Sequence, residues 1–185
     1  MESGGENTVD NKQQNKVLTE MFIRPVGVVR NEVKKPTLFA ETDDLAQRPQ
    51  GKRGEYKKRI SELVIDKNYA ESLDGIEGFS HLLVLYWAHL TRAEGRRLTK
   101  VHPMGRKDLP LTGIFATCSP ARPNPILVTA VRLLARMDNV LKVEGLDAVD
   151  GSPIVDLKPY NPGFCAAENV KVAGWMEKVY REMQQ

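Results

Sequence analysis

Residues 118–125 combine polar side chains with three prolines within six positions. Proline fixes φ, removes a backbone donor and pushes the preceding residue toward an extended conformation. Arg122 and Asn124 therefore lie in a stiff loop, and a stiff loop that presents polar side chains suits a preorganised site. In the alternative interpretation, Asn124 caps backbone groups and Arg122 pairs with a nearby carboxylate. The residue types favour neither interpretation over the other.

A second polar segment follows at residues 145–160. Asp147 and Asp150 lie three residues apart around a tight turn, where their carboxylates could accept hydrogen bonds from ribose hydroxyls. Aspartate also commonly caps its own turn, and this second role is favoured for Asp150, which precedes a glycine. Lys158 and Tyr160 stand at the end of the next strand, where they either contact a substrate phosphate or base or simply lie at the surface.

The elements that must position these residues are mainly β. Short runs rich in β-branched and aromatic residues, separated by turn residues, predict strands. Near its C-terminus the chain changes to helical spacing of apolar residues, which predicts an amphipathic helix over 167–184. Many short strands with one terminal helix favour a closed, antiparallel-rich β-barrel with short helices. The predicted strands are 22–30, 60–65, 79–90, 113–117, 126–134, 141–146 and 153–157.

The polar stretches between these strands divide into a tail and two long basic loops. Residues 1–20 lack hydrophobic periodicity and are expected to form a mobile tail, leaving 21–185 as one domain. Segments 31–59 and 91–112 are expected to be irregular. Their basic residues form either a solvated face or, if both loops flank Arg122, a phosphate-binding rim. These residues are Lys52, Arg53, Lys57, Lys58, Arg59, Arg92, Arg96, Arg97, Lys100, Arg106 and Lys107.

Histidine and cysteine offer no metal site in the sequence. His81 and His89 share a face of one predicted strand but lie about 26 Å apart at ~3.3 Å per residue, so they cannot bind one ion. His89 is a candidate for lining a pocket, whereas His81 is expected to be structural and His102 solvated. Cys118 has no neighbouring base to activate it, and we interpret it as a small residue in a pocket wall.

The overall composition is that of a globular domain. The chain has 185 residues, a net charge of +3 and 41% hydrophobic residues. No apolar run approaches the ~20 residues that span a bilayer, and the N-terminus has no apolar leader segment. We therefore expect a cytoplasmic protein with no membrane contact, and its modest basic excess would tolerate a polyanionic partner.

Four segments resemble a known family. They are PVGVVR at 25–30, GIEGFSHL at 75–82, FATCSPARPNPI at 115–126 and LDAVDGSPIVDLKPY at 146–160. Together, and in this order, they resemble the signatures of the TrmO family, also called TsaA or YaeB-like, over about residues 22–160. The resemblance implies a single-sheet β-barrel methyltransferase that acts as a homodimer, uses S-adenosylmethionine and needs no metal. It also implies a tRNA substrate, methylated on N6 of threonylcarbamoyladenosine beside the anticodon.

The resemblance further implies site residues. Arg122 and Asn124 would be the polar catalytic residues at the reacting end. The donor would be bound by Arg48, His89, Leu90, Cys118, Val128, Asp147, Ala148, Val149 and Asp150.

The sequence departs from the family pattern at several points. Cys118 stands where the family commonly has arginine, and Leu127-Val128-Thr129 follows the Asn-Pro-Ile motif in place of the usual residues. The additional C-terminal domain of the bacterial members is not found here, and the first-loop donor motif survives only as Gln47-Arg48-Pro49-Gln50. Two alternatives therefore stand beside the tRNA methyltransferase: a methyltransferase of the same fold that acts on a small metabolite, and a non-catalytic module that binds the donor or a nucleotide.

Overall fold

The computed structural model describes residues 21–48, 55–165 and 167–183, so the predicted tail at 1–20 lies outside the described residues. The strands are β1 Gly27–Arg30, β2 Leu38–Glu41, β3 Asp44–Gln47, β4 Ile60–Ile65, β5 His81–Trp87, β6 Lys100–Val101, β7 Thr112–Gly113, β8 Ile126–Met137, β9 Val140–Glu144 and β10 Pro153–Pro159. The α-helices are α1 Pro162–Cys165 and α2 Gly174–Met183. Short 3₁₀ turns cover Glu55–Lys58, Lys67–Leu73, Ile76–Gly78, Gly95–Arg97, Pro103–Gly105 and Ile114–Ala116.

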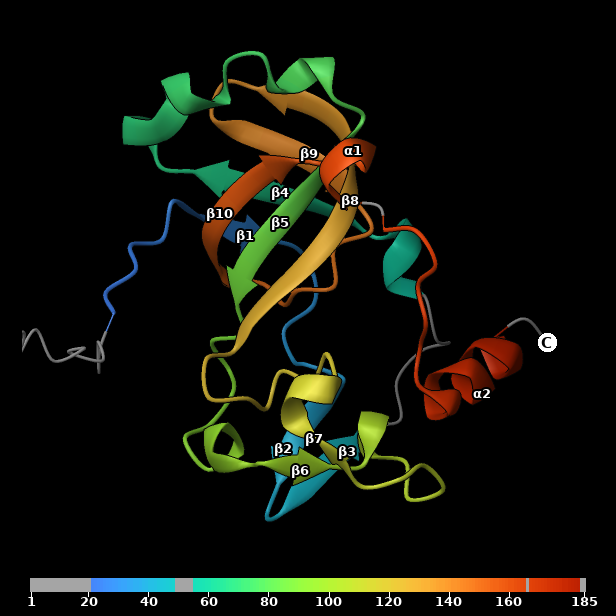
Figure 1. Ribbon diagram of the computed structural model, residues 1–185. Coiled ribbons are helices and arrows are strands. Elements are labelled where there is room, and N and C mark those ends of the chain that lie inside the picture. Colours follow the sequence, from blue (N-terminus) through green and yellow to red (C-terminus); the bar gives the residue numbers. More distant parts are fainter. Residues whose placement is uncertain (1–20, 49–54, 166, 184–185) are drawn as a thin grey trace, which may run out of the picture.

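Six strands close into a barrel in the order β1-β10-β5-β8-β9-β4, and each neighbouring pair is antiparallel. In Figure 1 the barrel forms the upper part of the molecule. The mainly β, closed-barrel prediction is therefore confirmed. Closure leaves no free edge over most of the sheet, and it provides a rigid frame for the loops that leave its ends.

Burial alternates along the strands of the barrel. In β5, Leu82, Val84 and Tyr86 point inward and are almost fully buried, while the residues between them face outward. Leu63 of β4 and Leu141 of β9 fill the same interior. This period of two is what a sheet with one buried face requires, and it fixes the strand register.

A smaller lobe lies below the barrel in Figure 1 and is built from β2, β3, β6, β7 and the turn at Ile114–Ala116. The two-stranded sheets β2-β3 and β6-β7 surround a separate apolar cluster of Leu45, Val101, Ile114 and Ala121. Segments 31–59 and 91–112 were expected to be irregular, and this expectation is wrong where they form these strands. The strands are too short and too polar to give a periodic pattern.

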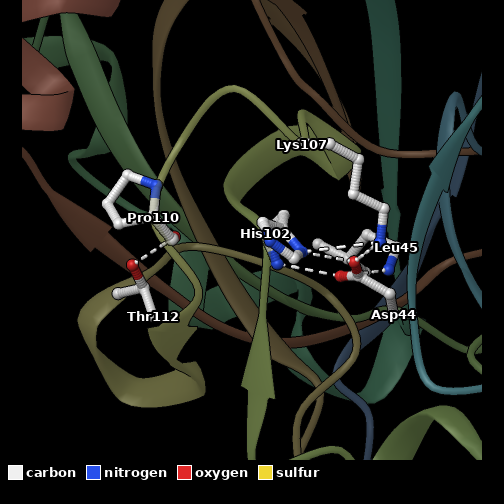
Figure 2. Close-up of polar contacts among 6 residues, drawn as sticks. All are labelled: Asp44, Leu45, His102, Lys107, Pro110 and Thr112. Atoms are coloured by element: carbon white, nitrogen blue, oxygen red, sulfur yellow. Dashed lines mark hydrogen bonds and ion pairs between the residues drawn. The ribbon is translucent and has the colours of Figure 1, made fainter.

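Asp44 holds the small lobe together through a buried carboxylate, only 9% of which is exposed. It accepts hydrogen bonds from the backbone N–H groups of Leu45 and His102, both at 2.8 Å, and from His102 Nδ1 at 2.6 Å. Lys107 Nζ donates to the same carboxylate, as Figure 2 shows. Asp44 thus ties β3 to the segment after β6. The expectation that His102 is solvated is wrong, because its ring is held by Asp44.

We expect D44A to lower the free energy of unfolding by about 2–3 kcal/mol, the range for loss of a buried, charge-assisted hydrogen-bond acceptor. Urea unfolding followed by circular dichroism measures the change. The exposed neighbour Asp43 gives the matched control, because D43A removes the same charge from the same hairpin and should change the stability by less than about 0.5 kcal/mol. Equal stability of the two variants would contradict this role for Asp44.

The same carboxylate predicts an acid dependence. Burial alone would raise the pKa of Asp44, but hydrogen bonds from Lys107, the backbone of His102 and Leu45, and the His102 ring outweigh burial and hold this pKa well below its usual range. A depressed folded pKa contributes stability that is complete above the unfolded value of about 3.9 and is lost as the pH falls toward the folded value. Wild-type protein should therefore lose more stability below about pH 4 than D44N does.

Other predicted elements also differ from the structure. The strand expected at 22–30 is only β1, Gly27–Arg30. The strand expected at 113–117 is only Thr112–Gly113, and the chain then turns into the 3₁₀ turn that carries Ile114 inward. The helix expected over 167–184 is confirmed only as α2, which begins at Gly174. Asn169 has a positive φ of 55°, which a continuous helix does not allow.

Ion pairs attach α2 to the small lobe. The guanidinium of Arg106 pairs with Asp108 and Glu182, and Lys178 Nζ lies 2.8 Å from Asp108. Val179 of α2 is buried, which adds an apolar contact. Within the described ranges, no helix has the length and apolar character to cross a membrane.

Candidate functional site

A cavity of about 700 Å³ opens beside β8, between that strand and the turn that follows β9. Arg122 and Cys118 of the proline-rich loop line it, and Gly145 and Asp147 of the acidic turn line it from the other side. Two segments that the sequence singled out independently therefore meet at one cavity.

The edge of β8 forms the cavity wall. Ile126–Ala130 are consecutive lining residues, although side chains of a strand alternate between its two faces. Successive residues can all border one cavity only where the cavity meets the strand edge. The pairing explains this edge: β8 pairs with β9 only from Arg132 onward, so residues 126–131 have β5 as their sole strand partner among the described residues.

Arg122 is fixed by its own loop. Its Nε donates to the carbonyl of Ser119 at 2.8 Å, and its Nη2 donates to the carbonyl of Thr117 and, at 3.4 Å, to that of Ile114. All three partners are neutral carbonyl oxygens, and no described carboxylate pairs with the guanidinium. The expected alternative of an ion pair is thus not found in this part of the chain. Arg122 therefore presents an uncompensated positive charge in a rigid position at the cavity.

Two residues outside the acidic turn hold it in place. The Tyr86 hydroxyl, rising from the barrel interior, donates to the carbonyl of Asp147 and lies 3.3 Å from Thr129 Oγ1. Asn31 donates through Nδ2 to the carbonyl of Ala148 at 3.0 Å. The backbone N–H of Asn31 also donates to Asp150 Oδ1 at 3.0 Å. The turn is therefore anchored to both the barrel core and the segment after β1.

Asp147 is the unpaired acid of the cavity. Its side chain is accessible to solvent, and its carboxylate forms no hydrogen bond or ion pair with any described residue. The protein packed around it raises its pKa above the ordinary value, while the charge of Arg59 acts in the opposite direction. An ionised carboxylate is purely a hydrogen-bond acceptor, so Asp147 is placed to accept from hydroxyl groups of a ligand.

Several lining residues were missed by the sequence analysis. Tyr86 is buried in the barrel core, and its hydroxyl reaches the cavity wall. Tyr56 and Lys57 line the cavity from the 3₁₀ turn before β4, and burial, then the charge of Asp147, raises the pKa of Tyr56. A polar tip on an otherwise apolar strand was the signal for Tyr86, since a buried tyrosine hydroxyl usually has a partner. No comparable signal marked Tyr56.

Most of the other predicted site residues lie away from the cavity lining. Arg48 stacks on the ring of Phe39 at 4.2 Å and donates to the carbonyl of Pro36 at 2.6 Å, so it braces the β2-β3 hairpin. Asn124 is exposed, and its side chain has no hydrogen bond within the described residues. Ala148 is buried in the barrel core.

Asp150 and His89 lie together at the next bend. Lys34 Nζ donates to Asp150 at 2.8 Å, and this bond, then the Asn31 N–H, lowers the pKa of Asp150. His89 lies beside Gly151, and its Nδ1 is buried with no hydrogen-bond partner among the described residues. Burial lowers the pKa of His89, opposed by the charge of Asp150. Leu90 and Val149 belong to the same region and do not line the cavity, whereas the exposed Val128 does.

The two substrate candidates differ in their surroundings. Lys158 is exposed and paired with Asp156 at 2.7 Å. Tyr160 contacts His81 edge to face, with ring centroids 6.5 Å apart, and His81 lines the cavity. His81 was expected to be purely structural, and its place on the cavity wall had no signal in the sequence.

The two basic loops keep only part of their charge free. Arg106 and Lys107 are paired with carboxylates, and Arg96 stacks on Trp87 at 5.3 Å. Lys52 and Arg53 lie outside the described residues. In the described part of the chain, no three histidine, cysteine or acidic side chains gather as metal ligands would. Both cysteines are free thiols.

Comparisons with known proteins identify relatives. The sequence model of the tRNA-methyltransferase O N-terminal domain matches residues 37–165. A protein of Methanothermobacter thermautotrophicus named "probable S-adenosyl-L-methionine-binding protein" is 43% identical over 141 residues, which are 76% of this chain and 90% of that protein. The tRNA (adenine(37)-N6)-methyltransferase of Escherichia coli is 36% identical over 141 residues, which are 74% of this chain and 56% of the enzyme.

A solved structure agrees with these sequence matches. The crystal structure of TrmO superposes with a TM-score of 0.60 at 26% identity, covering 84% of this chain and 64% of that one. The chain thus spans less than two thirds of the length of the crystallised protein and of the Escherichia coli enzyme.

Proposed function

The chain belongs to the tRNA-methyltransferase O N-terminal domain family, and on this basis we propose that it uses S-adenosylmethionine to methylate N6 of a modified adenosine in tRNA. The finer assignment is threonylcarbamoyladenosine beside the anticodon, the position numbered 37 in the name of the Escherichia coli relative. The observation that carries the proposal is the cavity that Arg122 and Asp147 line from opposite sides. Neither side chain forms an ion pair with a described residue.

The residues of the cavity fit the donor. S-adenosylmethionine would supply an electrophilic methyl group on a sulfonium together with ribose hydroxyls, an adenine and a carboxylate. Asp147 is placed to accept hydrogen bonds from the ribose hydroxyls, and the Tyr86 hydroxyl fixes the carbonyl of Asp147. The guanidinium of Arg122 suits an anionic group of either the donor or the acceptor. The cavity volume of about 700 Å³ lies within the ~300–1,000 Å³ typical of small-molecule sites.

The protein contributes to methyl transfer mainly by positioning the two reactants. Methyl transfer from a sulfonium is an in-line displacement, so holding the two reactants in line accounts for much of the rate. The prolines around Arg122 and the hydrogen bonds around Asp147 supply that rigidity on opposite sides of one cavity. The edge of β8 borders the third side and offers peptide groups as further hydrogen-bond partners.

We expect the purified chain to bind S-adenosylmethionine and to transfer its methyl group to tRNA. The substrate is total tRNA from an Escherichia coli strain that lacks its own tRNA (adenine(37)-N6)-methyltransferase. Calorimetry measures donor binding, and mass spectrometry of the digested tRNA locates the new methyl group. Absence of donor binding would contradict the proposal. A methyl group on another nucleoside would correct the acceptor.

A second candidate is a methyltransferase of the same family that acts on a small metabolite. It is favoured by Cys118, which gives the cavity wall a neutral side chain, and by the ion pairs that neutralise Arg106 and Lys107. Donor binding with no methylation of any tRNA nucleoside, together with methylation of a small molecule in a cell extract, would favour this candidate.

We also propose that the protein works as a cytoplasmic homodimer. Val128 is apolar, 62% exposed and on the cavity wall, where a second copy could cover it. Light scattering of the purified chain tests the assembly, and a monomeric mass at micromolar concentration would contradict it.

A further inference from the structure

The cavity extends along β8 beyond the two loops that carry Arg122 and Asp147. Along β8 it reaches from Ile126 to Arg132, a distance of six residue steps, or about 20 Å at ~3.3 Å per residue. Arg132 therefore lies about 13 Å along the strand from Val128. Arg132 and Asp147 belong to different segments of the cavity wall, so the Arg132 part of the wall can contact a group other than the one that Asp147 binds.

The far end has its own polar constellation. His81 on β5 pairs directly with Arg132 on β8, which in turn pairs with Glu144 on β9. Directly opposite residues of neighbouring strands project to the same face, with Cβ atoms about 4.5–5.5 Å apart. All three residues line the cavity. The register thus builds a row of one imidazole, one guanidinium and one carboxylate across three strands.

Arg132 is available for a ligand. Its side chain is 64% exposed, and its guanidinium makes no hydrogen bond within the described residues. Its ion pair with Glu144, at 3.8 Å, is long enough that the two groups share no hydrogen bond, so the N–H groups of Arg132 stay available. A guanidinium with free N–H groups on a cavity wall is suited to bidentate binding of a phosphate.

His81 is held in place from two sides. Ser80 Oγ lies 2.9 Å from its Nδ1, and the Tyr160 ring packs against it at an interplanar angle of 63°. The backbone N–H of Tyr160 also donates to the carbonyl of His81 at 2.9 Å. Nε2 has no partner among the described residues, so a fixed imidazole edge remains beside Arg132. Tyr160 therefore acts on the cavity through His81.

We propose that Arg132 and His81 form an acceptor subsite that binds a backbone phosphate of the RNA strand, while Asp147 binds the donor at the other end. This inference rests on the proposed function and adds which end of the cavity receives the acceptor.

The test is binding of a 17-nucleotide anticodon stem-loop RNA to R132Q, measured by fluorescence anisotropy with S-adenosylhomocysteine present. R132Q should weaken RNA binding about tenfold and leave the calorimetric Kd for S-adenosylmethionine within twofold. The slope of log K against log salt should become shallower by about 0.7–0.9, the change for one lost phosphate contact. H81Q should weaken RNA binding less than R132Q does.

Arg24 provides the matched control, since it is exposed and does not line the cavity. R24Q removes the same charge and should leave both RNA affinity and salt slope unchanged. An unchanged affinity and slope in R132Q would overturn the subsite, even if the wild-type chain methylates tRNA. Weakened RNA binding in R132Q would support it, even if no methyl transfer occurs.

A mononucleotide separates the two possible sources of the phosphate. If adenosine 5′-monophosphate binds the wild-type chain and R132Q weakens it, while the stem-loop does not bind at all, the RNA-strand proposal is overturned. The site would then be one for a phosphorylated metabolite. If the stem-loop binds and the mononucleotide does not compete with it, the RNA strand is the occupant.

Discussion

D147A is expected to weaken S-adenosylmethionine binding about 10- to 100-fold, the range that corresponds to loss of a charge-assisted hydrogen bond of about 1.5–3 kcal/mol. The physical reason is that Asp147 is an acid on the cavity wall whose carboxylate is unpaired in the described structure, so its acceptor capacity is available to ribose hydroxyls. Calorimetry measures the change. D147N, which keeps one acceptor oxygen but no charge, should lie between the wild type and D147A.

The control for Asp147 is Asp138, which lies in the turn between β8 and β9 with a positive φ of 56°. Asparagine tolerates this conformation, so D138N should change neither stability nor donor affinity. A donor affinity of D147A within twofold of the wild type would remove Asp147 from the donor site.

Acidification provides a second measurement on the same residue. The pKa of Asp147 is raised by the surrounding protein, so its carboxylate is protonated at a higher pH than an ordinary aspartate with a pKa of about 3.9. Protonation turns one carboxylate oxygen from a hydrogen-bond acceptor into a hydrogen-bond donor. The affinity for S-adenosylmethionine should therefore be full above the raised pKa of Asp147 and fall as the pH drops through it. D147N should show weaker binding with no such fall.

R122Q is expected to lower kcat/KM for methyl transfer about 100-fold or more. Arg122 donates hydrogen bonds to three carbonyl oxygens of its loop, and a glutamine side chain can replace only some of these hydrogen bonds. A shift of about 1 Å in a positioning group can cost about 100-fold in rate. R122K should be nearly as impaired, because lysine keeps the charge but lacks the planar fork.

The readouts of the Arg122 variants distinguish positioning from folding. The free energy of unfolding should change by less than that of D44A, because Arg122 is half-buried and bonds neutral carbonyl oxygens of its own loop, whereas Asp44 is a buried charge that joins distant segments. R181Q, on the exposed surface of α2, removes an arginine far from the cavity lining and should retain wild-type kcat/KM. Full activity of R122K would show that charge alone is needed and would contradict the positioning role.

The barrel could be predicted from the sequence because its strands carry their own signal. The continuous apolar run at residues 82–87 is a local pattern typical of a buried strand, and Leu82, Val84 and Tyr86 of this run fill the barrel interior. The β8-β9 hairpin was equally visible, since Asp138 and Asn139 mark its turn. Both features depend only on neighbours in sequence.

The small lobe could not be predicted, because its contacts are distant in sequence. Asp44 and His102 are 58 positions apart, and no local sequence pattern at either residue predicts their contact. Strands of two residues such as β6 and β7 exist only because the apolar cluster around Val101 supports them. Arg48 was assigned to the donor by resemblance, and the ring of Phe39 that it packs on is a partner that sequence position alone does not reveal.

The two polar segments of the candidate site were predicted from the sequence. The residues that hold these segments in place were not. Proline stiffening around Arg122 and the aspartate turn at Asp147 are readable from residue type. The anchors of the turn, Asn31 and Tyr86, are 117 and 61 positions away from the carbonyl groups they hold. Sequence reasoning therefore finds the groups that face a ligand more readily than those that fix them.

The open edge of β8 has a consequence for the divergence of such proteins. In an antiparallel strand, every second residue points its N–H and C=O away from the paired neighbour, so residues 126–131 offer peptide groups on the cavity side. These groups are the same in every amino acid except proline, which lacks the N–H. Side chains along this stretch can therefore drift over evolutionary time while the wall keeps its recognition chemistry, and alanine scanning there would register mainly changes in shape.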